Sequence, residues 1–485
     1  MSQHVSANAQ YRRIVYMICL IGALGGLLFG LDQGFIANSL ATIDKVYGLT
    51  TEQGEHYSAV LAWGGILGAL LSGLFARFLG RKKVLVLAGF LFTLLSLISS
   101  LLPPLGILTA CRFGLGFAVG IASFTVPLYL SETAPTSIRG GMATLFQLMI
   151  TIGIFLIAVT NVAIAKVLGH FEISLSLMFG VIVLFAAIMF LGSLFLPESP
   201  RWLMLKGREV EARKVLARVR ESQEVIEEEV SEIKESIRVN QGSGAAMLSK
   251  GYFWKILVVG VVLQMFQQLV GINMMIYYAP TIFGYAGMTG IIALLAIPTV
   301  NMLFTFPAIK WIDKWGRKKL LYMGATVMMI SMFAAGFAFL SIAHSAPGAI
   351  SKTVLLLSAV VYIFGFACSW GPVAWVICAE VFPLKGREIG MTVTTMINWT
   401  FAGVVMANAL SFMKANGNAS IFFVFGGFCI LSMIFLKFFV PETKGVSLEH
   451  IEANLENGVP LRDLGKVDGQ SQGQNINAGL AGTKA

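Results

Sequence analysis

Two ionisable residues, Asp32 and Arg112, stand deep inside long apolar stretches of the sequence. A charged side chain at the centre of a membrane helix costs at least about 2.5–3.5 kcal/mol, so such residues usually serve a function. Asp32 lies about 18 residues into its stretch, or roughly 27 Å along a helix. Arg112 lies about seven residues into a stretch that runs in the opposite direction, which places it at a similar depth. We expect the two side chains to pair.

A carboxylate that gains and loses a proton beside a guanidinium can couple proton movement to a change of conformation. We therefore predict that Asp32 carries a proton and that Arg112 tunes its proton affinity. Deprotonated Asp32 would pair with Arg112, and protonation would release that constraint. The alternative is a permanent ion pair that only locks two helices together.

A second set of side chains is rich in neutral amides, whose donors and acceptors suit the hydroxyl groups of a sugar. Aromatic residues near them could cover the apolar faces of a sugar or close the site. The alternative is that the amides join helices, at roughly 0.6 kcal/mol per contact, and that the tryptophans anchor the membrane interface. The predicted amides are Gln147, Gln267, Gln268, Asn273, Asn301 and Asn398, and the predicted aromatic residues are Phe29, Tyr277, Trp375 and Trp399.

A third set consists of charged residues at the ends of apolar stretches, on one side of the predicted membrane. Opposite charges from the two halves of the chain could bridge and hold that side shut. The alternative is ordinary topology signal together with solvated pairs worth about 0–1 kcal/mol. The predicted inner-gate residues are Arg81, Glu132, Arg139, Glu198, Arg317, Glu380 and Arg387, with Asp313 and Glu442 as further candidates.

The elements that must position these residues are membrane helices. The chain has 485 residues, of which 56% are hydrophobic and only 12% are charged, and one soluble core could not bury so much apolar surface. Roughly 20 apolar residues cross a bilayer, and twelve stretches qualify. They are 14–40, 56–78, 83–102, 105–130, 141–165, 174–196, 253–284, 288–312, 319–343, 353–381, 388–413 and 418–440.

The distribution of Lys and Arg predicts the orientation of these helices. The net charge of +10 reflects basic loops on one side of the membrane, which is typical of cytoplasmic loops and needs no nucleic-acid partner. With an even number of spans, both termini are predicted to be cytoplasmic. The lipid bilayer is therefore a partner of this all-α protein.

The chain also repeats itself. FLGRKKVLVL at 78–87 is similar to KWGRKKLLYM at 314–323, and LPESPR at 196–201 is similar to VPETKG at 440–445. Duplication of one six-helix half is a transporter architecture, with sites at the midplane between the halves. The predicted domains are an N-terminal bundle 1–196, a cytoplasmic helical linker 197–250, a C-terminal bundle 251–440 and a partly disordered cytoplasmic tail 441–485.

Several classes of protein are disfavoured. The sequence offers no nucleophile–base set, no phosphate loop and no cluster of metal ligands, so we expect neither an enzyme nor a cofactor or metal; the proton is the coupling ion. Nothing demands more than a monomer. The five cysteines all lie in apolar stretches and are interpreted as packing residues without disulfides.

Nine segments in order resemble the sugar porter family of the major facilitator superfamily, over nearly the whole chain, with bacterial galactose–proton and arabinose–proton symporters as the most similar members. The segments are GGLLFGLDQG (25–34), GRKK (80–83), PLYLSETAPTSIRGG (127–141), QLMITIG (147–153), PESPRWL (197–203), QQLVGIN (267–273), DKWGRKK (313–319), SWGPVAWVICAEVFPLKGR (369–387) and VPETKGVSLEHIE (440–452). The resemblance implies twelve transmembrane helices in two pseudo-symmetric six-helix bundles, with short cytoplasmic helices between them.

The resemblance also implies roles for single residues. Asp32 is similar to the proton-coupling carboxylate and Arg112 to its partner. The second set, together with Gly371, matches sugar-contacting or site-lining positions, and the third set matches the inner gate. Two departures are Arg77, where an acidic residue is usual, and Leu175–Ser176 in place of a Trp-Arg pair.

We therefore expect a proton-coupled monosaccharide symporter of the bacterial inner membrane that works by alternating access. The sugar, a hexose or a pentose, is left open. One alternative is a facilitator of the same fold, in which Asp32 and Arg112 are only structural. Another is a sugar sensor that binds without transport.

Overall fold

The structure, a computed structural model, describes residues 2–134, 139–239, 244–288, 290–344, 348–383, 385–444, 446 and 448–465. Within these residues the regular elements are helices, and twelve helical spans are long and apolar enough to cross a membrane. Each predicted stretch corresponds to one of them. The expectation of an all-α membrane protein is therefore confirmed.

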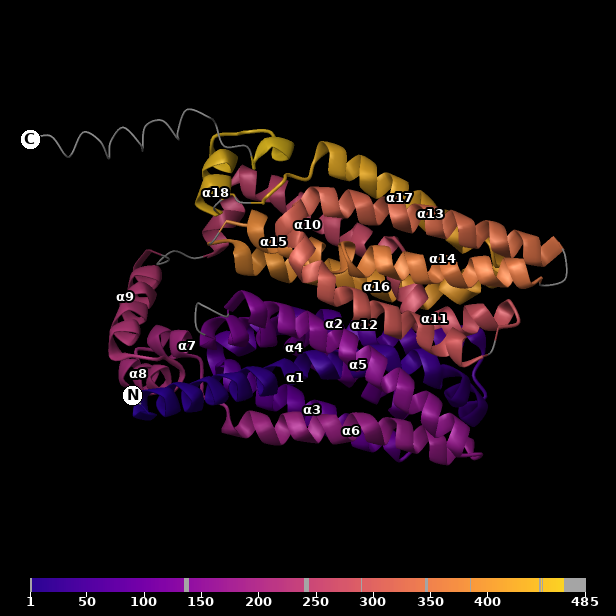
Figure 1. The fold of residues 1–485 in the computed structure, drawn as a ribbon, viewed down its shortest axis with the longest axis horizontal. Helices are drawn as coiled ribbons and strands as arrows, with labels where there is room; N and C mark the ends of the chain where they lie inside the picture. Colours follow the sequence, from indigo (N-terminus) through magenta and orange to yellow (C-terminus); the bar gives the residue numbers. More distant parts are fainter. Residues whose placement is uncertain are drawn as a thin grey trace, which may run out of the picture.

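The first six spans are single helices that run back and forth along the bundle. They form one layer of the molecule, indigo to magenta in Figure 1. Their bounds are α1 Ser2–Tyr47, α2 Thr51–Leu79, α3 Arg81–Ser100, α4 Leu105–Thr133, α5 Arg139–Val167 and α6 Phe171–Phe195.

The last six spans form the second layer, and two of them are each built from two helices. Gly271 lies between α10 and α11 in the left-handed backbone region (φ 100°) that favours glycine. Ser369 separates α14 from α15. The bounds are α10 Gly251–Leu269, α11 Ile272–Tyr285, α12 Ile291–Trp315, α13 Arg317–His344, α14 Ala349–Ala367, α15 Trp370–Val381, α16 Arg387–Asn416 and α17 Ser420–Phe438.

These breaks differ from the sequence expectation. The sequence predicts one helix over 253–284, and the helix breakers Gly371 and Pro372 predict an interruption of the tenth span, 353–381, at those two residues. Instead, α15 begins at Trp370 and includes both residues in its first turn. Proline is tolerated there because the first N–H groups of a helix have no partner within the helix.

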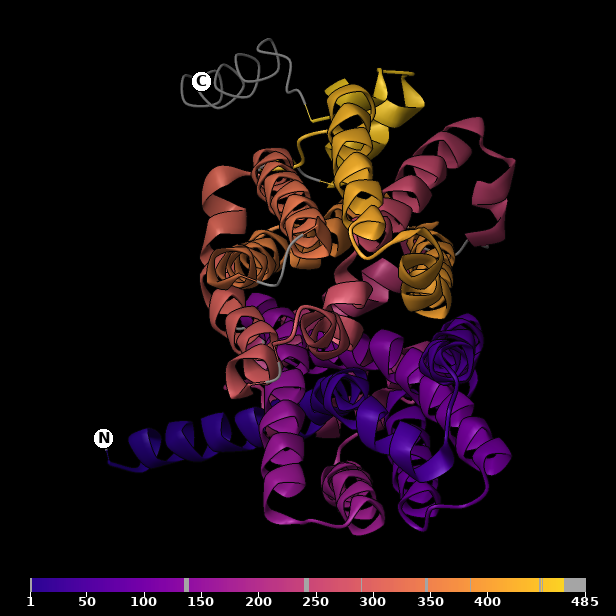
Figure 2. The same ribbon diagram turned by 90° about the vertical axis from the view of Figure 1, so that its right-hand side faces the viewer.

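The two ends of the helix bundle differ in what lies beside them. We call the end at which α3 and α13 begin the linker end, because the short helices α7 Pro200–Leu205, α8 Glu209–Val219 and α9 Gln223–Val239 lie beside it (Figure 1). The opposite end, where α2 and α12 begin, is the distal end; it faces the viewer in Figure 2. Across the layers, α1 contacts α11, α2 contacts α16 and α5 contacts α12.

Glycines allow the helices of the first layer to pack closely. A Cβ at Gly26 or Gly30 of α1 would lie 2.7 or 2.0 Å from a carbonyl oxygen of α5. A Cβ at Gly64 or Gly68 of α2 would lie 2.0 or 2.2 Å from one of α4. Small residues at such spacings let membrane helices approach backbone to backbone. Helix α1, which carries Asp32, therefore packs tightly against α5.

The linker helices pack around a small apolar cluster that includes Trp202, Leu216 and Ile226. Arg220 fixes this unit to the first layer: its Nη1 donates to the carbonyl of Thr133 at the end of α4 (3.0 Å), and its Nη2 donates to Glu229 (2.6 Å).

All five cysteines are buried and free, so the expectation that they are packing residues without disulfides is confirmed.

Candidate transport site

Asp32 of α1 and Arg112 of α4 meet in the interior of the first layer. Arg112 Nη1 donates to Asp32 Oδ1 at 2.7 Å, and both side chains are fully buried. The ring of Tyr57, on α2, lies 5.6 Å from the guanidinium carbon. The predicted pairing is confirmed.

The pair is joined by one hydrogen bond rather than two. Asp32 Oδ2 and Arg112 Nε and Nη2 are buried and make no hydrogen bond to the described part of the protein. A buried polar atom without a hydrogen-bond partner costs free energy, so its presence in a folded protein needs an explanation such as a functional role. One carboxylate oxygen therefore remains available to a proton without displacing the arginine first.

The amide residues of α10, α11 and α16 form one hydrogen-bond network. Asn398 lies at its centre: its Nδ2 donates to Gln264 and Gln267 (both 2.7 Å), and its Oδ1 accepts from Gln268 (3.0 Å). Gln268 also accepts from Asn273 Nδ2 at 2.5 Å. All five residues are at most 6% exposed. Four of them, all except Gln264, were predicted to line a sugar site.

Two members of this network were missed by the sequence analysis. Gln264 precedes the QQLVGIN segment by one helical turn, so the same helical periodicity could have found it. Gln33 is the residue after Asp32, and its Nε2 donates to Asn273 Oδ1 at 3.3 Å. Because Gln33 belongs to the first layer and Asn273 to the second, this bond joins the two halves.

Aromatic residues pack beside the network. Trp399 is 7% exposed, and its ring lies 5.5 Å from that of Phe29 on α1. A Cβ at Gly65 of α2 would touch the Trp399 ring at 2.8 Å, so α2, α1 and α16 meet at this side chain. Tyr277 is buried on α11, one turn from Asn273.

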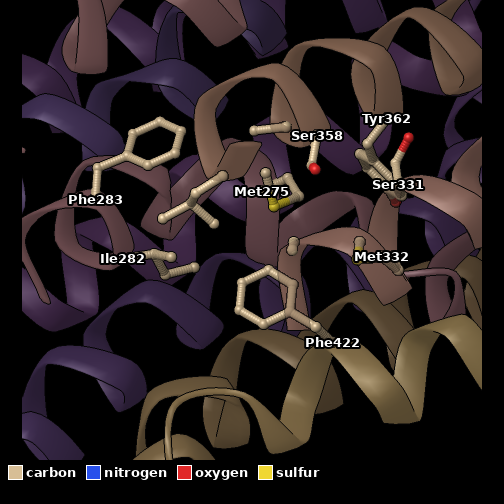
Figure 3. Close-up of a pocket in the computed structure, with 11 residues that line it drawn as sticks. Met275, Ile282, Phe283, Ser331, Met332, Ser358, Tyr362 and Phe422 are labelled. Carbon is tan, nitrogen blue, oxygen red and sulfur yellow. The ribbon is translucent and has the colours of Figure 1, made fainter. Parts of the chain in front are cut away.

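The other predicted sugar contacts come from three further helices. Asn301 is buried on α12, Gln147 is half-buried on α5, and Gly371 and Trp375 lie on α15. Within the described part of the chain, none of their side chains hydrogen-bonds to the amide network. The small cavity in Figure 3 does not contain them either, since it lies within the second layer and is lined by apolar residues of α11, α13, α14 and α17 with three hydroxyl side chains among them.

The charged residues of the first half form a clamp at the linker end. Arg81 pairs with Glu132 through two bonds of 2.9 and 2.8 Å, and the Ser199 hydroxyl donates to the same carboxylate at 2.5 Å. Glu198 accepts from the backbone N–H groups of Arg81 (2.8 Å) and Lys82 (3.0 Å). A carboxylate at a helix N-terminus is favoured by the unpaired N–H groups there.

The second half repeats this clamp. Arg317 pairs with Glu380 at 3.2 and 2.8 Å, and Thr443 donates to Glu380 at 2.5 Å. Glu442 accepts from the backbone N–H groups of Arg317 (2.9 Å) and Lys318 (3.0 Å). The similarity of the repeated sequence segments therefore extends to their hydrogen bonds.

In this conformation each ion pair given above joins residues of one half: Arg81 pairs with Glu132, and Arg317 pairs with Glu380. Bridging of the two halves by these charges stays a prediction. Arg387 is the first residue of α16. The side chains of Arg139 and Asp313 lie outside the described residues.

A family model described as "Sugar (and other) transporter" matches residues 18–455. The chain belongs to this sugar transporter family. One relative in it, the galactose-proton symporter of Escherichia coli K12, is 40% identical over 461 residues, covering 94% of this chain and 98% of that protein. The D-xylose transporter of Levilactobacillus brevis is 38% identical over 443 residues, covering 90% and 95%.

Solved structures of sugar transporters have the same fold. The proton:xylose symporter XylE bound to 6-bromo-6-deoxy-D-glucose is 31% identical with a TM-score of 0.78, covering 91% of this chain and 99% of that one. The inward open conformation of XylE from Escherichia coli is 30% identical with a TM-score of 0.78, covering 90% and 99%. The expected fold and family are confirmed.

Proposed function

We propose that the protein carries a monosaccharide together with a proton across the membrane by alternating access. One observation carries this proposal: two neighbouring residues of α1 each belong to a different buried site. Asp32 accepts from Arg112, and Gln33 donates to Asn273 in the amide network of the other half. Relatives named as galactose-proton and arabinose-proton symporters and a D-xylose transporter support a sugar as the substrate class.

Proton binding is proposed to act through Asp32. A proton on its Oδ2 neutralises the carboxylate and weakens its attraction for Arg112. Because Gln33 follows Asp32 on the same helix, a shift of α1 also changes its bond to Asn273. Sugar and proton together then favour a conformation that neither favours alone.

Sugar binding is proposed to replace bonds within the amide network. Each sugar hydroxyl both donates and accepts, as Gln267, Gln268, Asn273 and Asn398 do among themselves. Phe29, Trp399 and Tyr277 would cover the apolar faces of the ring or close the site. Gln147, Asn301, Gly371 and Trp375 are proposed to complete it.

The linker end is proposed to face the cytoplasm of a bacterium, with both termini on that side. Its basic residues support this orientation, because cytoplasmic loops are rich in Lys and Arg, and the bacterial relatives support the inner membrane. We further propose that segments 1–196 and 251–440 move as units joined by 197–250, with 441–485 as a tail. A monomer in the lipid bilayer, without a cofactor, is sufficient for this mechanism.

The clamps of Arg81–Glu132–Glu198 and Arg317–Glu380 are proposed to belong to the inner gate. Here they hold the starts of α3 and α13 within each half. When the linker end closes, we propose that these residues, with Arg139 and Arg387, meet across the halves.

The test is the external pH of lightly buffered, de-energised cells when galactose, glucose, xylose or arabinose is added. Symport predicts alkalinisation with one or more of these sugars, and its loss in Asp32→Asn. Labelled sugar that enters the cells without any change in external pH would instead identify a facilitator. Binding of sugar to the purified protein without entry would identify a sensor.

A further inference from the structure

Besides Asp32, another acidic residue is buried in the membrane-spanning region, and neither the proton site nor the sugar site uses it. Glu55 of α2 is 1% exposed. Its Oε1 accepts from the backbone N–H groups of Leu410 (2.5 Å) and Ser411 (3.0 Å), and its Oε2 accepts from the Ser411 hydroxyl. All three donors belong to α16, in the opposite half of the molecule.

The backbone of α16 is bound at both ends of the same turn. The hydroxyl of Tyr278 on α11 donates to the carbonyl of Met406 at 2.6 Å. In a regular α-helix this carbonyl is the partner of the Leu410 N–H, four residues later. Glu55 thus accepts hydrogen bonds from amide groups of this turn, and Tyr278 donates a hydrogen bond to a carbonyl group of the same turn. Two other helices therefore bond to the backbone of α16 here.

The position of this contact distinguishes it from the clamps. Glu55 is four residues from the start of α2 at Thr51, and Ser411 is five residues from the end of α16 at Asn416. Both ends are at the distal end of the bundle. The clamps at the linker end join residues within one half, whereas Glu55 joins the halves. Opening the distal side requires α2 and α16 to separate there, which breaks all three bonds.

We propose that Glu55 is a positioning residue that latches the distal side shut, and that releasing its bonds to Leu410 and Ser411 is a step in opening the site to the outside. This inference rests on the alternating access proposed above. Hydrogen bonds to an ionised carboxylate are about twice as strong as neutral ones, so a neutral amide at this position weakens the latch. The balance between the two conformations then shifts towards the one open at the distal end.

A cysteine at Ser58 reports on this opening. Ser58 is fully buried one turn from Glu55, and the native cysteines in the described chain are buried as well. We would measure the rate at which a membrane-impermeant maleimide labels Ser58→Cys from outside intact cells, in the full-length chain without sugar. Loss of one charge-assisted bond predicts a roughly 10-fold faster rate in Glu55→Gln.

Two further variants sharpen the test. Ser411→Ala removes one donor and keeps the carboxylate, so it should raise the rate by a smaller factor. Glu52→Gln removes an exposed carboxylate one turn earlier on α2 and should leave the rate unchanged. A merely structural role for Glu55 would lower thermal stability without changing the labelling rate.

Unchanged labelling in Glu55→Gln overturns the proposal. If that variant does not fold, unchanged labelling in Ser411→Ala overturns it instead. The outcome is separable from the proposed function, because labelling needs neither sugar nor a proton gradient. If the native chain moves no protons but the variants are labelled faster, the proposal of a Glu55 latch is supported and only the proposal of proton coupling is rejected.

Discussion

At the scale of single residues, Asp32 and Arg112 combine burial with incomplete bonding. The pair is fully buried, yet three of its polar atoms make no hydrogen bond to the described protein. A purely structural ion pair is most stable when its remaining lone pairs and protons are satisfied. The arrangement therefore favours a carboxylate that changes its protonation state over a permanent lock.

The amide network gives a residue-scale prediction. Asn398→Ala removes the centre of the network, so Gln264, Gln267 and Gln268 each lose their hydrogen bond to Asn398. A sugar hydroxyl that bonds to Asn398 is left without this partner in the variant, which costs about 1–3 kcal/mol, so we expect sugar binding to weaken by roughly 5- to 150-fold. Isothermal titration of the purified protein would measure it.

The matched control is Asn408→Ala. Asn408 is an exposed amide on the same helix, and its Nδ2 donates to the carbonyl of Val404. This variant should bind sugar as the native chain does. Equal loss in both variants would mean that the network has no special part in binding.

Part of the site can be predicted from residue type and depth. Asp32 and Arg112 were predicted because charges are rare in apolar stretches. The two stretches run in opposite directions through the membrane, and this placed both residues at a similar depth. Glu55 was missed because the predicted span begins at 56, whereas α2 begins at Thr51. Gln33 was missed because its bond reaches a helix more than 200 residues away in sequence, and no local pattern encodes such a contact.

At the scale of elements, the position of Asp32 depends on how closely α1 approaches α5. Gly30→Leu should destabilise the protein, because even the Cβ would lie 2.0 Å from the Ile150 carbonyl oxygen. Overpacking of this kind costs at least about 1–3 kcal/mol. We expect a lower melting temperature in detergent and loss of transport.

Gly73 provides the control for that prediction. It also lies in a membrane helix, α2, but a Cβ there meets nothing within 4 Å. Gly73→Ala should therefore melt like the native protein. A normal melting temperature for Gly30→Leu would show that α1 does not need its close packing.

Hydropathy predicts these elements well and their breaks poorly. All twelve apolar stretches became helical spans because a bilayer leaves few other conformations for the backbone. The break between α10 and α11 has no hydropathy signal, because apolar residues continue on both sides of Gly271. Only the left-handed backbone at that glycine reveals it.

At the scale of the whole molecule, the two halves share one clamp design but differ in exposure. The side chains of Arg81 and Glu132 are 8% and 5% exposed, whereas those of Arg317 and Glu380 are 12% and 25% exposed. Removing one partner of a buried pair costs about 3–5 kcal/mol, and removing one partner of an exposed pair about 1 kcal/mol or less. We expect Glu132→Gln to lower the melting temperature more than Glu380→Gln does. Equal or reversed shifts would contradict this reading of the clamps.

The duplication of the chain was predictable from its repeated segments, because the same residues make the same bonds in both halves. Whether the clamps bridge the halves was not predictable, since the sequence does not specify the conformation. In this conformation, the bonds between the halves include Gln33–Asn273 and the contacts of Glu55.

The central claim is that a proton gradient drives sugar uptake through Asp32. The most direct measurement is sugar accumulation in proteoliposomes that contain the purified protein and have an acidic exterior. We predict that the native chain concentrates the transported sugar above its external level, whereas Asp32→Asn only equilibrates it. A native chain that equilibrates the sugar regardless of the gradient would contradict the account.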